Sequence, residues 1–320
     1  MSENSIVISN LTSVPVLVFL LGFIAALFKS DVKLPDQVYQ AISVFLLFGI
    51  GLKGGHSLKG VDVQSFIVPA LATIFLGATI PLFAYMALGL GGKLSIEDRG
   101  SFAAHYGSTS LVTFTAALLF LENSEISVEP FATALLTIME VPGIIVGIYL
   151  GSRRTKTGAP WAHTLREVIT GKTITMLIGG MAIGFVTTGS GYDRVSPFFV
   201  DIQYGVLALF LLHLGCLAGG NLSQISHVGF TIAIFAVTFP ILTGALGVFA
   251  GTAVGLSVGG ATILGVLCAS ASYIAAPAAV NLALPNANSS SALISSIGVT
   301  FPFNLIIGIP LILEVAKFLN

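Results

Sequence analysis

The sequence predicts an all-α protein that crosses a membrane ten times, and three observations lead to that fold class. Hydrophobic residues make up 55% of the 320 residues and charged residues only 8%, against about 25% charged residues in an average soluble domain. No charged residue falls between Asp62 and Lys93 or between Asp201 and Glu314. The apolar runs approach or exceed the roughly 20 residues that a membrane-spanning helix needs. A water-soluble fold is therefore excluded.

Ten apolar runs follow one another along the chain, most of them ended by charges or by clusters of Gly, Pro, Asn and Ser. Only the Gly and Ser residues of 257–260 separate the eighth run from the ninth. The predicted spans cover residues 14–28, 38–52, 65–90, 97–121, 130–152, 173–189, 197–219, 228–256, 259–284 and 291–313.

The basic residues orient these spans, because Lys and Arg in short loops stay on the cytoplasmic side. The densest basic cluster follows the fifth span and consists of Arg153, Arg154, Lys156, Arg166 and Lys172. Residues 153–172 are therefore predicted to form a cytoplasmic connecting loop, and both termini are predicted to lie outside. The loop that holds Glu122, Glu125 and Glu129 then also lies outside.

The two halves of the chain, 1–152 and 173–320, resemble each other at a nearly constant spacing. Residues 52–56 (LKGGH) recur 165 positions later as 217–221 (LAGGN), 106–109 (YGST) lie opposite 270–273 (SASY), and 140–142 (EVP) opposite 300–302 (TFP). Five spans in each half force the second half to insert upside down. Inverted repeats of this kind are typical of secondary transporters. The alternative is that glycine-rich membrane helices resemble one another by composition alone.

Polar residues gather near the middle of the fourth and ninth spans, at 105–110 (HYGSTS) and 270–277 (SASYIAAP). Ser and Thr compete for backbone hydrogen bonds and cap new helices, and Pro fits a first helical turn. Helices 4 and 9 are therefore predicted to be broken and to cross at the midplane. Unwound backbone at that depth requires protein or a wet cavity around it. The alternative is that these hydroxyls only join neighbouring helices.

Two such breaks would offer binding sites for both kinds of ion. Each second half-helix begins at the midplane, where its positive N-terminal end attracts an anion. Each first half-helix ends there, and its free carbonyls attract a cation such as sodium.

Glu140 is the only carboxylate deep in a span. A carboxylate at that depth is costly and by default marks a site. It would either neutralise a sodium ion or carry a coupling proton. The alternative is a structural group beside a helix kink at Pro142.

Other function classes lack support in the sequence. A net charge of -1 excludes binding along a nucleic-acid backbone. Cys216 and Cys268 sit in apolar runs and build no zinc site. No polar domain carries a nucleophile triad, a pair of acids or a phosphate loop, so we expect neither an enzyme nor a cofactor other than a coupling sodium ion.

Four stretches carry a resemblance to a known family. They are Phe48–Gly55, Ala104–Ser108, Ser270–Ala279 and Gly298–Asn304. They resemble the sodium-dependent bicarbonate transporter family, which includes the cyanobacterial SbtA-like permeases. The resemblance implies a gate domain from helices 1, 2, 6 and 7 and a core domain from helices 3–5 and 8–10. It also implies a homotrimer in which the core moves against the gate like an elevator.

The resemblance also implies site residues. It places the bicarbonate site at Gly107, Ser108, Thr109, Ser110, Ser270, Ala271, Ser272 and Tyr273, and the sodium site at Ser110, Glu140, Ser270 and Ser272. Glu140 stands where the cyanobacterial pattern has Asp, which keeps the charge and lengthens its reach. The connecting loop is shorter than in cyanobacterial members, which leaves open whether a PII-like regulatory protein docks on it.

We therefore expect a symporter in the bacterial inner membrane that imports bicarbonate with sodium. A sodium-coupled carrier of another small organic anion is the alternative from the same class. From a different class, the chain would be a non-transporting membrane receptor or scaffold for a soluble nucleotide-sensing partner. The paired midplane breaks favour transport, because a scaffold does not need costly broken helices.

Overall fold

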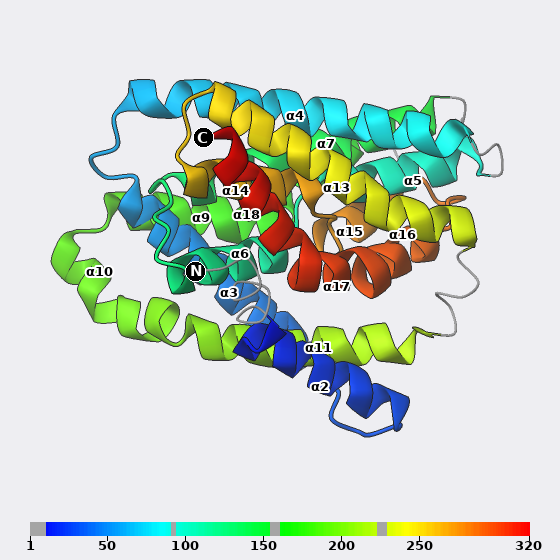
Figure 1. The fold of residues 1–320 in the computed structure, drawn as a ribbon, viewed down its shortest axis with the longest axis horizontal. Helices are drawn as coiled ribbons and strands as arrows, with labels where there is room; N and C mark the ends of the chain where they lie inside the picture. Colours follow the sequence, from blue (N-terminus) through cyan, green and yellow to red (C-terminus); the bar gives the residue numbers. More distant parts are fainter. Residues whose placement is uncertain (1–10, 91–93, 154–160, 223–228) are drawn as a thin grey trace.

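The computed structural model describes residues 11–90, 94–153, 161–222 and 229–320, and within them the chain is helical without any strand (Figure 1). The first half contains α2 (Val14–Leu27), α3 (Asp36–Ser57), α4 (Val63–Leu90), α5 (Ile96–Gly107), α6 (Leu111–Asn123) and α7 (Ala132–Ser152).

The second half begins with α8 (Trp161–Thr170) and α9 (Lys172–Val186). A continuous run follows, made of α10 (Gly189–Ser196), the π-helical turn η1 (Pro197–Asp201) and α11 (Gln203–Gly220). Next come α13 (Phe230–Ala253), α14 (Val258–Ala269) and α15 (Ala275–Ala283). The chain ends in another continuous run, with α16 (Ser289–Ser295), η2 (Ser296–Thr300), α17 (Phe301–Phe303), η3 (Asn304–Gly308) and α18 (Ile309–Leu319).

Within the described residues, seven helical segments are long and apolar enough to cross a membrane, and the chain is a multi-pass membrane protein. Three shorter apolar helices, Val14–Leu27, Lys172–Val186 and Val258–Ala269, overlap the remaining predicted runs. The ten-span topology and its orientation stay predictions. The predicted connecting loop 153–172 contains α8, whose ten residues are amphipathic rather than apolar and which the sequence analysis did not predict.

The last membrane run is irregular because two prolines interrupt its backbone hydrogen bonds. Pro302 and Pro310 lack the backbone N–H that donates a hydrogen bond in a regular α-helix. The π-helical turns η2 and η3 end two residues before Pro302 and Pro310, respectively. Such π turns are frequent at functional sites. They rotate the register of this run, and Asn304 begins the second of them.

The helices pack in two groups. In one, α3 runs along α9 and α2 runs along α11, and Figure 1 shows α2 and α11 together at one edge of the molecule with α4 at the opposite edge. In the other, α4, α5 and α7 pack together, as do α13, α14 and α18. Glycines permit the closest contacts: a methyl carbon at Gly184 of α9 would lie 2.2 Å from the carbonyl oxygen of Leu52 in α3.

Replacing Gly184 by alanine tests the α3–α9 contact. The added methyl has no room, so the two helices must separate, and overpacking of this kind costs about 1–3 kcal/mol. We expect a lower thermal unfolding midpoint for Gly184→Ala in detergent. Gly179→Ala is the matched control on the same helix, because nothing lies within 4 Å of its added carbon. Equal unfolding midpoints for the two variants would contradict the close contact.

Candidate functional site

The first half of the site is the interruption between α5 and α6. α5 ends at Gly107, Ser108 and Ser110 are extended, and α6 begins at Leu111. The Ser110 hydroxyl accepts hydrogen bonds from the backbone N–H and the hydroxyl of Thr113, at 3.2 and 2.9 Å. Ser110 is therefore the N-cap of α6, the role in which serine is strongly favoured.

The second half of the site is the interruption between α14 and α15. α14 ends at Ala269, Ser270 is extended, and α15 begins at Ala275. The Ser270 hydroxyl donates to the carbonyl of Leu267 at 2.8 Å, and the Ser272 hydroxyl accepts from the N–H of Ala276 at 3.2 Å. Serine hydroxyls thus form hydrogen bonds at both ends of this interruption, whereas in the first interruption only the Ser110 hydroxyl does so.

The two interruptions are hydrogen-bonded to each other although they are about 160 residues apart in sequence. The Ser110 N–H donates to Ser270 Oγ at 2.9 Å, and Ser110 Oγ donates to the Tyr273 hydroxyl at 3.0 Å. In the other direction, the Ser272 N–H donates to the carbonyl of His105 at 2.7 Å. Each interruption therefore satisfies backbone groups that the other leaves free where its helix ends. The structure brings together Ser110, Ser270, Ser272 and Tyr273.

Two hydroxyls of the first interruption remain without a partner. Ser108 Oγ and Thr109 Oγ1 are buried and make no hydrogen bond within the described residues, and the two side chains are only 1% and 3% exposed. A buried hydroxyl without a partner costs about 1–3 kcal/mol. These two hydroxyls are therefore free to donate hydrogen bonds to a polar ligand in the site. Gly107 and Ala271, which the sequence analysis also assigned to the bicarbonate site, are buried as well.

Glu140 lies on α7 at the level of the first interruption. A methyl carbon at Gly143 would lie 1.9 Å from the carbonyl oxygen of Gly107, and one at Gly147 would lie 2.2 Å from the backbone nitrogen of Ala104. The two helices are thus antiparallel and in close contact, so Glu140, about one turn before Gly143, lies level with the start of α6. Its side chain is 3% exposed and makes no hydrogen bond or ion pair with any described residue.

Asn304 is a further buried polar residue that the sequence analysis did not select. Its amide Nδ2 donates to the carbonyl of Ala269, the last residue of α14, at 2.7 Å, and its Oδ1 is buried without a partner. Asn304 is the only carboxamide between Ser291 and Leu313. The same rule that selected Glu140, that polar groups deep in a span mark sites, would have found it.

Thr300 links the last membrane run to α5. Its hydroxyl lies 2.8 Å from the Tyr106 hydroxyl and donates to the carbonyl of Ala236 at 2.7 Å. Thr300 is the residue that the sequence repeat pairs with Glu140. The hydroxyl of Thr300, which is neutral, therefore has two hydrogen-bond partners. The carboxylate of Glu140 at the matching position of the first half has no partner among the described residues.

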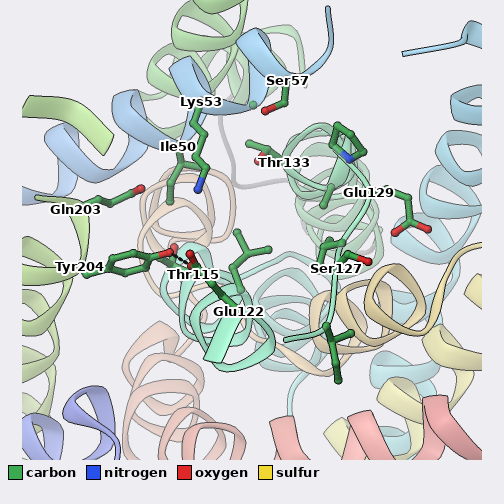
Figure 2. Close-up of a pocket in the computed structure, with 16 residues that line it drawn as sticks. Ile50, Lys53, Ser57, Thr115, Glu122, Ser127, Glu129, Thr133, Gln203 and Tyr204 are labelled. Atoms are coloured by element: carbon green, nitrogen blue, oxygen red, sulfur yellow. Dashed lines mark hydrogen bonds between the residues drawn. The ribbon is translucent and has the colours of Figure 1, made fainter. Parts of the chain in front are cut away.

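A cavity of about 370 Å³ (Figure 2) is lined in part by α6, the helix that begins at the first interruption. Its walls are α3, residues 115–122 of α6, the loop 126–130, the start of α7 and the start of α11. Thr115 of α6 lines it, about 7.5 Å along the helix axis from Ser110. Among the described residues, no group of three or more His, Cys, Asp and Glu side chains is placed to hold a metal ion.

A comparison with protein families gives a match over most of the chain. The family model described as Na+-dependent bicarbonate transporter superfamily matches residues 15–317, which is nearly the whole chain. No curated protein matches the sequence.

Proposed function

Because the chain belongs to the Na+-dependent bicarbonate transporter superfamily, we propose that it imports bicarbonate together with sodium through the paired interruptions. The observation that carries the proposal is the reciprocal hydrogen bonding of the two interruptions around the unpaired hydroxyls of Ser108 and Thr109. α6 and α15 begin here, and helix N-termini favour an anion. The proposed bicarbonate site consists of residues 107–110 and 270–273.

The proposed sodium site combines hydroxyls with one carboxylate. Ser110, Ser270 and Ser272 supply oxygen atoms at the interruptions, and Glu140 supplies the negative charge from α7. Sodium is a hard cation, and proteins bind hard cations such as Ca²⁺ and Mg²⁺ through oxygen ligands. A buried carboxylate without a partner destabilises the fold. A bound cation would be that partner for Glu140 and would offset the cost of its burial.

The packing supports a division into gate and core. α3 with α9 and α2 with α11 form the proposed gate, and the remaining membrane helices form the core. The sequence repeat pairs α3 with α11, and each of them packs along one of the shorter apolar helices, α3 along α9 and α11 along α2. This likeness supports two inverted repeats, 1–152 and 173–320, and movement of the core against the gate as an elevator.

Three further properties belong to the proposal. The chain would work as a homotrimer in the bacterial inner membrane, with both termini outside. A PII-like regulatory protein is a candidate partner on the cytoplasmic side, where α8 lies between α7 and α9. The family is one of transporters, and the protein would have no catalytic activity.

Uptake into proteoliposomes tests the proposal. Purified protein is reconstituted, and accumulation of labelled bicarbonate is followed under an inward sodium gradient and under an equal choline gradient. We expect accumulation only with sodium. Equal uptake under both gradients would contradict sodium coupling. Uptake of acetate or another organic anion without bicarbonate would identify the alternative carrier, and no transport of any small anion would favour the receptor or scaffold.

A further inference from the structure

Each proposed sodium ligand has a counterpart in the other half of the chain. The sequence repeat, continued by one residue, pairs Ser110 with Ile274, Ser270 with Tyr106, Ser272 with Ser108 and Glu140 with Thr300. The structure supports the first pair, because Ser110 is the N-cap of α6 and Ile274 is the N-cap of α15. If both halves of the chain bound sodium, the four counterparts would form a second sodium site.

The counterpart set has no charge and one oxygen fewer. Ile274 has a hydrocarbon side chain where Ser110 has a hydroxyl. Thr300 has a neutral hydroxyl where Glu140 has a carboxylate. A cation in the interior of a protein is costly unless a negative charge lies beside it. Only the set that contains Glu140 therefore provides for the charge of a sodium ion.

Two of the remaining hydroxyls in the counterpart set are bound to each other. The Thr300 hydroxyl donates to the carbonyl of Ala236 at 2.7 Å and lies 2.8 Å from the Tyr106 hydroxyl. A hydroxyl has one proton, so Tyr106 must donate to Thr300. Both side chains are 1% exposed. The two hydroxyls therefore join α5, the last membrane run and α13 to one another, which is a structural role.

The backbone near the ends of the two first half-helices does not supply the missing ligands. The carbonyl of His105 in α5 accepts from the N–H of Ser272 at 2.7 Å. The repeat pairs His105 with Ala269, the last residue of α14, whose carbonyl accepts from the amide of Asn304 at 2.7 Å. Both carbonyls thus already have a donor. A second cation would have to displace the Asn304 amide.

The charges around the interruptions balance with one sodium ion. The ion neutralises the carboxylate of Glu140. Bicarbonate then adds one negative charge, which faces the N-terminal ends of α6 and α15. Each helix N-terminus is equivalent to roughly half a positive elementary charge, so the two ends together balance the anion. A second sodium ion would leave an excess of positive charge in the site.

We propose that each chain binds a single sodium ion and moves it together with one bicarbonate ion in an electroneutral step. The inference rests on the proposed function and adds its stoichiometry. The cation site is asymmetric: the first half contributes Glu140, whereas the matching position of the second half has become a structural contact. Ser108, the counterpart of Ser272, keeps its hydroxyl free for the anion.

The first test counts bound sodium without transport. Radioactive sodium is bound at saturation to purified protein in detergent, and the number of ions per chain is measured. We expect one ion for the parent protein and none for Glu140→Gln. Thr300→Val removes the counterpart hydroxyl and should still bind one ion, with a dissociation constant within about twofold of the parent value. Thr300→Ser keeps the hydroxyl and is the matched control for folding, followed by the unfolding midpoint.

The second test uses the membrane potential. Proteoliposomes with an inward sodium gradient receive a potassium diffusion potential of about 100 mV, negative inside. We expect bicarbonate accumulation to be the same with and without the potential, because no net charge moves. Two sodium ions per bicarbonate would carry one net charge inward, and about 100 mV would then raise the accumulation ratio by up to about fiftyfold.

The outcomes separate this inference from the proposed function. Two ions per chain, or uptake that increases with the potential, would overturn the single site although sodium-driven bicarbonate uptake is observed. One ion per chain that Glu140→Gln removes, with uptake of another monovalent anion in place of bicarbonate, supports the single site although the proposed substrate is wrong. Loss of sodium binding in folded Thr300→Val, with binding kept in Thr300→Ser, would make Thr300 a ligand and overturn the asymmetry.

Discussion

Replacing Glu140 by glutamine is expected to remove most of the sodium dependence of transport while the protein still folds. Glutamine has nearly the same size and still forms hydrogen bonds, but it carries no charge. The Glu140 carboxylate has no partner among the described residues, so folding loses no ion pair with it. If it binds sodium, the lost interaction is on the scale of a charged hydrogen bond, about 1.5–3 kcal/mol. The sodium half-saturation should then rise about tenfold to hundredfold.

Sodium-dependent uptake by proteoliposomes and the thermal unfolding midpoint in detergent check this expectation together. Glu314→Gln is the matched control, because Glu314 is an exposed carboxylate paired with Lys317 at 2.8 Å. A normal sodium response in well-folded Glu140→Gln protein would leave Glu140 a structural group beside Pro142. Retained sodium dependence with a changed dependence on external pH would instead assign a coupling proton to Glu140.

Replacing Ser108 by alanine is expected to weaken bicarbonate binding without weakening the fold. The Ser108 hydroxyl is buried and has no partner in the described structure. Its removal should leave the stability unchanged or raise it, because an unpaired buried hydroxyl costs about 1–3 kcal/mol. If the hydroxyl donates to a bound anion, its loss costs about 1.5–3 kcal/mol of binding. The half-saturation for bicarbonate should rise about tenfold to hundredfold.

Ser101→Ala provides the control for this variant. Ser101 lies on the same helix, α5, is also buried, and its hydroxyl also has no partner among the described residues. It is seven residues before Ser108 and therefore about 10 Å away along the helix axis. A rise in half-saturation for Ser108→Ala alone, with both unfolding midpoints unchanged or raised, fits an anion site at the interruption. Equal kinetics for both variants and the parent protein would place the anion elsewhere.

Ser110→Ala would be a weaker test of binding. Ser110 is the N-cap of α6 and is also bound to Tyr273 of the other interruption. Its loss therefore affects folding and binding at once, because removal of a serine cap typically costs about 1 kcal/mol. The distinction between Ser108 and Ser110 is not visible in the sequence, where the two serines occur in one short polar run.

Much of the fold could be predicted because it depends on local chemistry. Apolar runs between charges predicted several helices to within a few residues, as for the predicted span 14–28 and α2 (Val14–Leu27). The predicted span 197–219 is shorter than the helical segment Gly189–Gly220 that contains it. The structure interrupts the fourth and ninth runs at the predicted residues, since serine and threonine cap helices wherever they occur. α8 was missed because an amphipathic helix of ten residues has no apolar run to reveal it.

The sequence by itself determined the membrane class of the protein, the places where its helices run and the two places where they are interrupted. These properties follow from hydration of side chains and from backbone hydrogen bonding within a few residues. Only the tertiary structure decided which distant groups meet: Ser110 with Ser270, Asn304 with the end of α14, and Lys53 with Gln203 in one cavity. It also decided which polar groups stay unpaired, as at Ser108 and Glu140, because satisfaction of a buried group depends on every helix packed around it.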